Sequence, residues 1–166
     1  PIYGNYLKAN GGYSNAYTSR DHTNYHFEIR HEAFEGALDR MAQFFIAPLF
    51  TPEYINREVN AVQSEHKKNL MNDGWREYQL VRNHMRKDHP ANHFSTGSEE
   101  TLAGIKRAEF VNFYEKFYSA NRMALVILSS KPLDELEMMA REHLDQIFPR
   151  LASTAALRCL MFFQAL

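Results

Sequence analysis

The sequence of 166 residues lacks the features that mark several common classes of protein. Its single cysteine, Cys159, cannot form an internal disulfide, so the fold does not depend on an oxidising compartment. Acidic and basic side chains nearly cancel, at a formal net charge of -1, which argues against a surface for nucleic acid. No apolar run is long enough to span a bilayer. With few glycines and prolines and 45% hydrophobic residues, the composition is that of a globular domain.

The chain begins with Pro1 rather than methionine, and the residues that follow have the pattern of a helix entered part-way. We therefore interpret the sequence as an excerpt of a longer protein. No signal peptide opens the chain, but in an excerpt this leaves the compartment unknown, with cytoplasm and periplasm both open.

Hydrophobic periodicity predicts helices and a hairpin in the first half of the chain. A short helix over residues 2–9 should end at the glycines that follow it. Alternation over residues 13–19 and 23–30, around a polar turn, predicts two antiparallel strands. Residues 32–50 and 52–86 have the period of amphipathic helices. The second helix should start with Thr51 as its cap and Pro52 at its first position, and its break point is expected near Asn72-Asp73-Gly74.

The second half of the chain continues this mixed pattern. Residues 89–102 form a polar loop, and residues 106–118 a further helix. The unbroken apolar run Met123 to Leu128 predicts a strand buried on both faces. A last helix should open at Pro132, with acidic residues in its first turn.

The order of elements predicts an α+β class, with an antiparallel or mixed sheet packed by several helices. After Arg150 the character of the sequence changes, because residues 151–166 have no acidic side chain and no clear period. We therefore divide the chain into a domain over residues 1–150 and an atypical tail over residues 151–166.

Two glutamates on the long helix, Glu58 and Glu65, are candidates for metal chemistry. Seven residues correspond to roughly 700°, about 20° short of two turns, so both side chains lie on one face. Ala61 and Val62 lie between them on that face. One carboxylate could bind a cation while the other orients a neighbouring ligand. By spacing alone, a solvated acidic face is the simpler interpretation.

The surrounding residues change this balance, because the helix resembles the third-ligand helix of the insulinase and pitrilysin family of zinc metallopeptidases. The resemblance covers about residues 3–150 and is closer to insulin-degrading enzymes than to pitrilysin. The segments that carry it, in chain order, are Gly11 to Ser19, Asp21 to Tyr25, Phe34 to Arg40, Phe44-Phe45, Pro48 to Phe50, Arg57 to Val62, Ser64 to His66, Asn72 to Trp75, His89-Pro90 and Phe94 to Gly97.

In that family, two histidines of an inverted H-x-x-E-H motif and one distant glutamate hold zinc, and the glutamate of the motif is the general base. The resemblance implies that Glu65 is the third ligand and that Glu58 supports the site. It also implies a zinc metalloendopeptidase, with one Zn²⁺ per complete catalytic domain, that cuts internal bonds of small unfolded peptides. This sequence has no H-x-x-E-H motif. We expect the histidines and the base upstream of Pro1, so no catalytic residue is in this chain, and alone it should bind zinc weakly or not at all.

The hairpin is the second functional candidate, since a free strand edge can pair with a peptide through its backbone. The resemblance implies that Asn15 and Ala16, beside Tyr17, contact substrate, and that Trp75 and Tyr78 form an aromatic wall. Ordinary half-buried aromatic residues remain the alternative for these rings. The expected partners are peptide substrates and the remaining domains of the same polypeptide.

Other metal patterns in the sequence are near matches. His31 to Glu35, Val62 to His66 and Met139 to His143 each have one wrong residue, and we interpret all three as coincidence. His84, His89 and His93 lie in a polar segment and are interpreted as surface residues.

Two alternatives to a peptidase stay open. A family member with a decayed active-site motif could act as a peptide-binding or scaffold subunit. A truncated gene product would explain the tail over residues 151–166.

Overall fold

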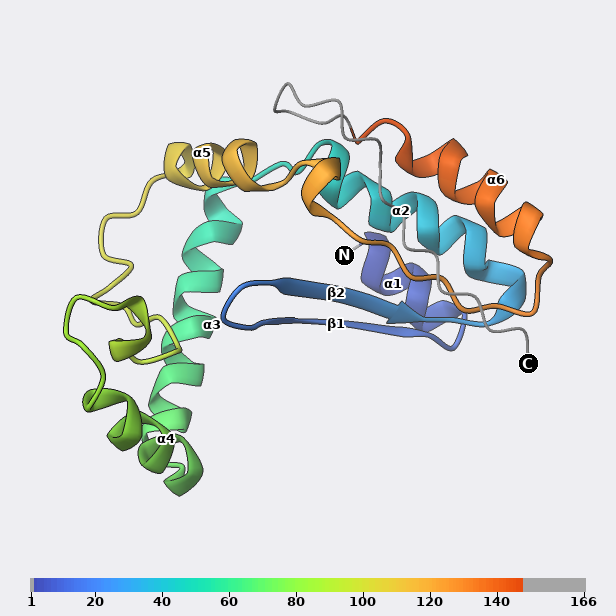
Figure 1. The fold of residues 1–166 in the computed structure, drawn as a ribbon. Coiled ribbons are helices and arrows are strands. Elements are labelled where there is room, and N and C mark those ends of the chain that lie inside the picture. Colours follow the sequence, from blue (N-terminus) through green and yellow to red (C-terminus); the bar gives the residue numbers. More distant parts are fainter. Residues whose placement is uncertain (1, 148–166) are drawn as a thin grey trace. The chain divides into compact units, whose positions relative to one another are not determined.

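Six α-helices and one β-hairpin form within residues 2–147, the part of the chain described by the computed structural model (Figure 1). This architecture confirms the predicted α+β class. The order is α1 (Ile2–Ala9), β1 (Tyr13–Thr18), β2 (Thr23–Glu28), α2 (Phe34–Ile46), α3 (Pro52–Leu70), α4 (Asp73–Asn83), α5 (Arg107–Phe117) and α6 (Leu133–Leu144), with short 3₁₀ turns at His31–Ala33, Pro90–Asn92 and Ala120–Arg122.

The chain folds as two compact units. The first comprises the described residues up to Leu49 and from Asn112 onward, and the second comprises Phe50–Val111. The predicted tail over residues 151–166 and the domain limit at residue 150 lie outside the described residues. No helix within residues 2–147 is both long enough and apolar enough to cross a membrane.

The hairpin of the first unit forms as predicted. β1 and β2 pair antiparallel, from Thr18 opposite Thr23 at the turn to Tyr13 opposite Glu28 at the open end. Gly11 has a φ of 69°, a left-handed conformation in which glycine is favoured. The Gly12 amide donates to the carbonyl of Leu7 at 2.7 Å, which closes α1 and turns the chain into β1.

The core of the first unit lies between α2 and α6, which pack side by side (Figure 1). Leu38 of α2 meets Leu136, Met139 and Ala140 of α6, together with Ile127. Phe27 of β2, with Phe34, Leu125 and Leu144, packs against this cluster. The hairpin is therefore attached to the helices through the apolar face of β2.

The predicted strand from Met123 to Leu128 is wrong. This segment has no secondary structure, and no other described segment pairs with it. Its burial alternates instead of being complete: Ile127 is buried, whereas Val126 and Leu128 are 64% and 62% exposed. Only one side of the segment packs on the core, and an extended chain without a neighbouring strand cannot form a ladder.

The second unit confirms the predicted break in the long helical pattern. Its cause is Asn72, which caps α4 because its side chain accepts a hydrogen bond from the Trp75 amide at 3.2 Å. At the other end of α3, Thr51 occupies the predicted cap position, but its side chain makes no capping hydrogen bond. Buried Asn69 donates to Thr96 Oγ1 at 3.0 Å, which ties the end of α3 to the polar loop.

The first unit also contains a cluster of aromatic rings outside the core described above. The rings of Tyr25 and Phe45 meet edge to face with centroids 5.3 Å apart, and the hydroxyls of Tyr25 and Tyr118 are hydrogen-bonded. Burial of the phenol, and then its bond with Tyr118, raise the pKa of Tyr25 above its ordinary value.

Gly12→Ala should lower the free energy of unfolding by about 1–3 kcal/mol, because the added Cβ would lie 2.3 Å from the backbone oxygen of Glu28. Gly4→Ala on α1 is the matched control, since its Cβ would meet no atom within 4 Å. The control should be neutral or stabilising by up to about 1 kcal/mol. Urea unfolding followed by circular dichroism measures both, and equal effects would contradict the steric account.

Tyr25 should make stability depend on alkaline pH. Its pKa is raised on folding, so the folded state favours the neutral phenol. The resulting stabilisation is complete below the unfolded pKa of about 10 and is lost as the pH rises through the folded pKa. Unfolding free energies of the unchanged chain should therefore fall more steeply above about pH 10 than those of Tyr25→Phe. Parallel curves would refute this contribution.

Candidate functional site

Helix α3 carries both sequence-predicted glutamates. It is continuous over Pro52–Leu70, so the seven-residue spacing does place Glu58 and Glu65 on one face. Both side chains are exposed. Neither carboxylate has a hydrogen-bond or ion-pair partner within residues 2–147, which leaves both acceptors available to a cation or to a group from another part of a longer protein.

The neighbouring His66 has a different environment. Consecutive helix residues diverge by about 100°, and His66 is half-buried whereas Glu65 faces solvent. Its ring meets Phe94 edge to face with centroids 5.2 Å apart, and Phe94 lies against Trp75 at 5.9 Å. His66 Nδ1 is shielded and has no hydrogen-bond partner among the described residues. This aromatic contact fixes α3 against α4 and the polar loop.

The residues of this chain do not by themselves fit a zinc ion at Glu65. Catalytic zinc takes three protein ligands, and in the described part of the chain no set of neighbouring His, Cys, Asp and Glu groups includes Glu65. The histidines of the polar segment do not supply a further zinc ligand beside Glu65 either. His89 Nδ1 instead accepts a hydrogen bond from the Ala91 amide at 3.1 Å, where it caps a 3₁₀ turn.

Trp75 and Tyr78 are three residues apart on α4, so they lie on neighbouring positions of one side of the helix. Trp75 is half-buried beside Phe94, and Tyr78 is exposed with the Arg82 guanidinium 5.1 Å from its ring centre. The pair can offer apolar surface together with a positive charge.

The hairpin residues belong to the first unit, whereas the glutamates and the two aromatic residues of α4 belong to the second. All of β1 is exposed, and within residues 2–147 no strand other than β2 pairs with it. The Ala16 amide donates to the Asn15 side-chain oxygen at 2.9 Å. Tyr17 is exposed, with its ring beside that of His22. β1 therefore presents an open edge to which a further strand could add.

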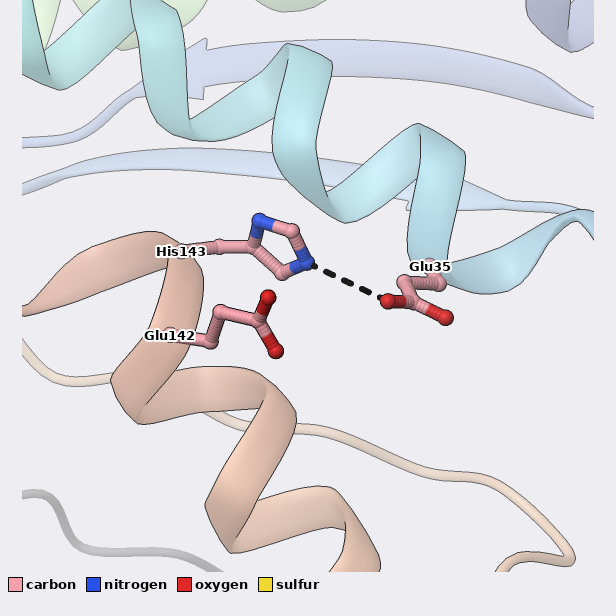
Figure 2. A group of neighbouring side chains, drawn as sticks. All are labelled: Glu35, Glu142 and His143. Atoms are coloured by element: carbon pink, nitrogen blue, oxygen red, sulfur yellow. Dashed lines mark ion pairs between the residues drawn. The ribbon is translucent and has the colours of Figure 1, made fainter.

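Sequence reasoning missed one group of side chains. Glu35 from α2 and Glu142 with His143 from α6 place their ligand atoms within 4.8 Å of one another (Figure 2). The sequence signals were two near matches to zinc motifs, whose last residues meet here although they are more than a hundred positions apart. Their spacing along the chain gives no sign that these residues are neighbours in the folded protein.

Comparison with known families accounts for most of the chain. Residues 3–88 match the model of Insulinase (Peptidase family M16), and residues 104–151 match that of the Peptidase M16 inactive domain. Together with the fold, these matches define a member of a peptidase family. The chain belongs to the insulinase family, peptidase family M16.

Individual relatives agree with this assignment. The chain is 48% identical to human insulin-degrading enzyme over 141 residues, which are 81% of this chain and 14% of that protein. It is 43% identical to the peroxisomal insulin-degrading enzyme-like 1 of Arabidopsis thaliana over 152 residues, which are 87% of this chain and 16% of that protein. The crystal structure of pitrilysin superposes with a TM-score of 0.84 at 34% identity, over 94% of this chain and 18% of that one.

These values confirm the expected resemblance to insulin-degrading enzymes, at higher identity than to the pitrilysin structure. The chain spans about a seventh of the length of the curated relatives it matches.

Proposed function

We propose that this chain is part of a zinc metalloendopeptidase that hydrolyses internal bonds of small unfolded peptides. The observation that carries the proposal is the pair of exposed, unpartnered carboxylates on one face of α3, in a chain of the insulinase family. Residues 1–150 would then form an amino-terminal peptidase domain, incomplete at its front, that works with the remaining domains of the polypeptide.

In this proposal Glu65 is the anionic ligand of Zn²⁺, and Glu58 orients a group beside it. Zinc, when bound, would polarise the scissile carbonyl and lower the pKa of a water molecule. The contribution of this chain is a negative charge held on a rigid helix, which the contact of His66 with Phe94 keeps in place. The two histidines and the general base are expected upstream of Pro1, so the 166-residue chain alone should hydrolyse no peptide.

Peptide would bind by adding to the edge of β1. The Ala16 amide, now bonded to the side chain of Asn15, would donate to the peptide backbone once Asn15 turns away. Such pairing demands little of the peptide sequence but does require an extended, unfolded segment. In the same proposal Tyr17, Trp75 and Tyr78 contact side chains of the substrate.

Glu65→Gln in the full-length protein should remove most of the bound zinc and of the peptidase activity while the fold survives, because a neutral amide is a poor replacement for the anionic ligand. Glu58→Gln should cost less, about 10–100-fold. Metal analysis and cleavage of a quenched fluorescent peptide measure both effects. Glu53→Gln, an exposed glutamate in the first turn of the same helix, is the matched control. Retained zinc and turnover in Glu65→Gln would refute its role, and equal losses at Glu58 and Glu65 would mean that their roles are misassigned.

Ala16→Pro in the full-length protein should raise KM for peptide by about tenfold or more, because proline removes the amide that would pair with substrate. Zinc content and the circular dichroism spectrum should stay unchanged, which separates lost pairing from lost structure. An unchanged KM in a folded, zinc-loaded variant would contradict binding at this edge.

A non-catalytic peptide-binding subunit is the second candidate. This candidate is supported by the match of residues 104–151 to the family model described as the Peptidase M16 inactive domain. The gene sequence upstream of Pro1 distinguishes the two, since a catalytic protein needs H-x-x-E-H there. A full-length protein without that motif, which binds peptide and does not cut it, would support the second candidate.

A further inference from the structure

We propose that Glu35, Glu142 and His143 form a binding site for a divalent transition-metal ion, with Zn²⁺ as its simplest occupant. The site lies within the first unit, where the start of α2 meets the end of α6 (Figure 2). It is independent of Glu65 and of the proposed peptidase activity. It therefore departs from the expectation, drawn from the missing histidines of the catalytic site, that this chain alone binds zinc weakly or not at all.

His143 is the central residue of the proposed site. Its side chain is only 16% exposed, and its Nε2 atom is shielded from solvent without a hydrogen-bond partner in the described part of the chain. The nearest carboxylate oxygen, of Glu35, lies 3.7 Å from Nε2, which is too far for a hydrogen bond. A buried polar atom without a partner is unfavourable because it has lost its hydrogen bonds to water, so this nitrogen needs either a proton shared with the acids or a cation.

The spacing of the three groups suits a cation. Zinc binds imidazole nitrogen and carboxylate oxygen at about 2.0–2.2 Å, so two ligand atoms of a tetrahedral site lie about 3.4 Å apart. The ligand atoms here lie within 4.8 Å of one another, and the Glu35 side chain is 60% exposed. The exposed glutamates can therefore close the remaining distance, at most about 1.4 Å, without disturbing the core.

The other ring nitrogen also faces a carboxylate. Nδ1 of His143 lies 3.8 Å from Asp39 Oδ1, which is beyond hydrogen-bond distance. Asp39 therefore adds negative charge beside the ring, which favours a bound cation. Two carboxylates and one imidazole suit Zn²⁺, Co²⁺ or Ni²⁺, whereas Mg²⁺ prefers oxygen ligands alone.

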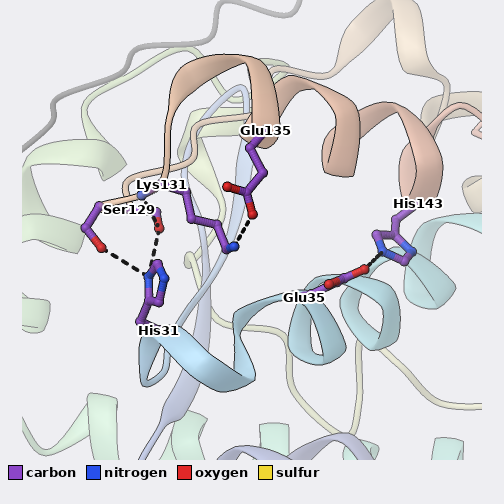
Figure 3. A network of polar contacts seen from close by, with 7 residues as sticks. His31, Glu35, Ser129, Lys131, Glu135 and His143 are labelled. Carbon is purple, nitrogen blue, oxygen red and sulfur yellow. Dashed lines mark hydrogen bonds and ion pairs between the residues drawn. The ribbon is translucent and has the colours of Figure 1, made fainter.

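The two helices are also held together independently of any ion. Beneath the cluster, Leu38 of α2 packs against Met139 and Ala140 of α6. Away from the cluster, before the start of α6, His31 Nδ1 lies 3.1 Å from Ser130 Oγ, which joins the segments that lead into α2 and α6. Lys131 pairs with Glu135 within that same end of α6 (Figure 3). The site is therefore built on packed elements, which lowers the cost of ordering its ligands.

The alternative is a protonated His143 that only pairs with Glu35 and Asp39 across α2 and α6. Such ion pairs between partly exposed groups contribute little to stability and need no metal. The two accounts differ in their response to zinc, which the following experiment measures on the 166-residue chain.

Zn²⁺ titrated calorimetrically into the 166-residue chain near neutral pH should bind at one site, and Co²⁺ should give the visible absorption of a low-coordinate complex. His143→Gln and Glu35→Gln should each weaken binding by about tenfold or more. The matched controls His84→Gln and Glu32→Gln, both exposed residues outside the cluster, should bind zinc like the unchanged chain. Mg²⁺ should not compete.

Two results would overturn the site: no zinc binding by the unchanged chain, or binding that Glu35→Gln and His143→Gln leave intact. If His143→Gln fails to fold, Glu35→Gln decides, because this exposed carboxylate is outside the core. Nuclear magnetic resonance of the His143 ring adds a direct test, in which a ring signal that responds to pH but not to zinc would establish the ion pair alone.

Discussion

The packing of α2 on α6 is the contact on which the first unit depends. Leu38, Leu136 and Met139 form the core between the helices, and Phe27 attaches the hairpin to it. A hairpin of two strands is marginal in water by itself, so the open edge of β1 exists as a stable surface only because β2 is anchored in this way. The same contact brings the start of α2 to the end of α6, where Glu35, Glu142 and His143 meet.

Helix α3 is organised by a different principle, since the face that carries Glu58 and Glu65 is exposed rather than packed. Its glutamates gain their position from the regularity of the helix and from anchors on its inner side, the contact of His66 with Phe94 and the bond of Asn69 with Thr96. Rigid support behind an exposed carboxylate is what a shared metal site needs when its other ligands come from elsewhere. Two carboxylates that stay hydrated lower the stability of the fold very little. Helix α3 can therefore carry Glu58 and Glu65 without a positive side chain beside them.

Much of the fold could be predicted, because local periodicity and turn residues indicate where helices and hairpins form. The hairpin, the start of α3 at Pro52 and the break at Asn72 all follow from neighbours within a few positions. The strand expected at Met123 to Leu128 failed for the opposite reason. An apolar run indicates that a segment is buried. A β-ladder also needs a second strand beside that segment, and local sequence does not show whether one is there.

The sequence by itself determined the family, the helix that holds Glu58 and Glu65 on one face, and the hairpin with Asn15 and Ala16, since each rests on residues close together in the chain. Only the tertiary structure decided which distant groups meet. Glu35 and His143 each ended a motif that had one wrong residue and looked accidental. Core packing between α2 and α6 made them neighbours and shielded the imidazole nitrogen, and burial of that kind depends on the whole unit rather than on spacing.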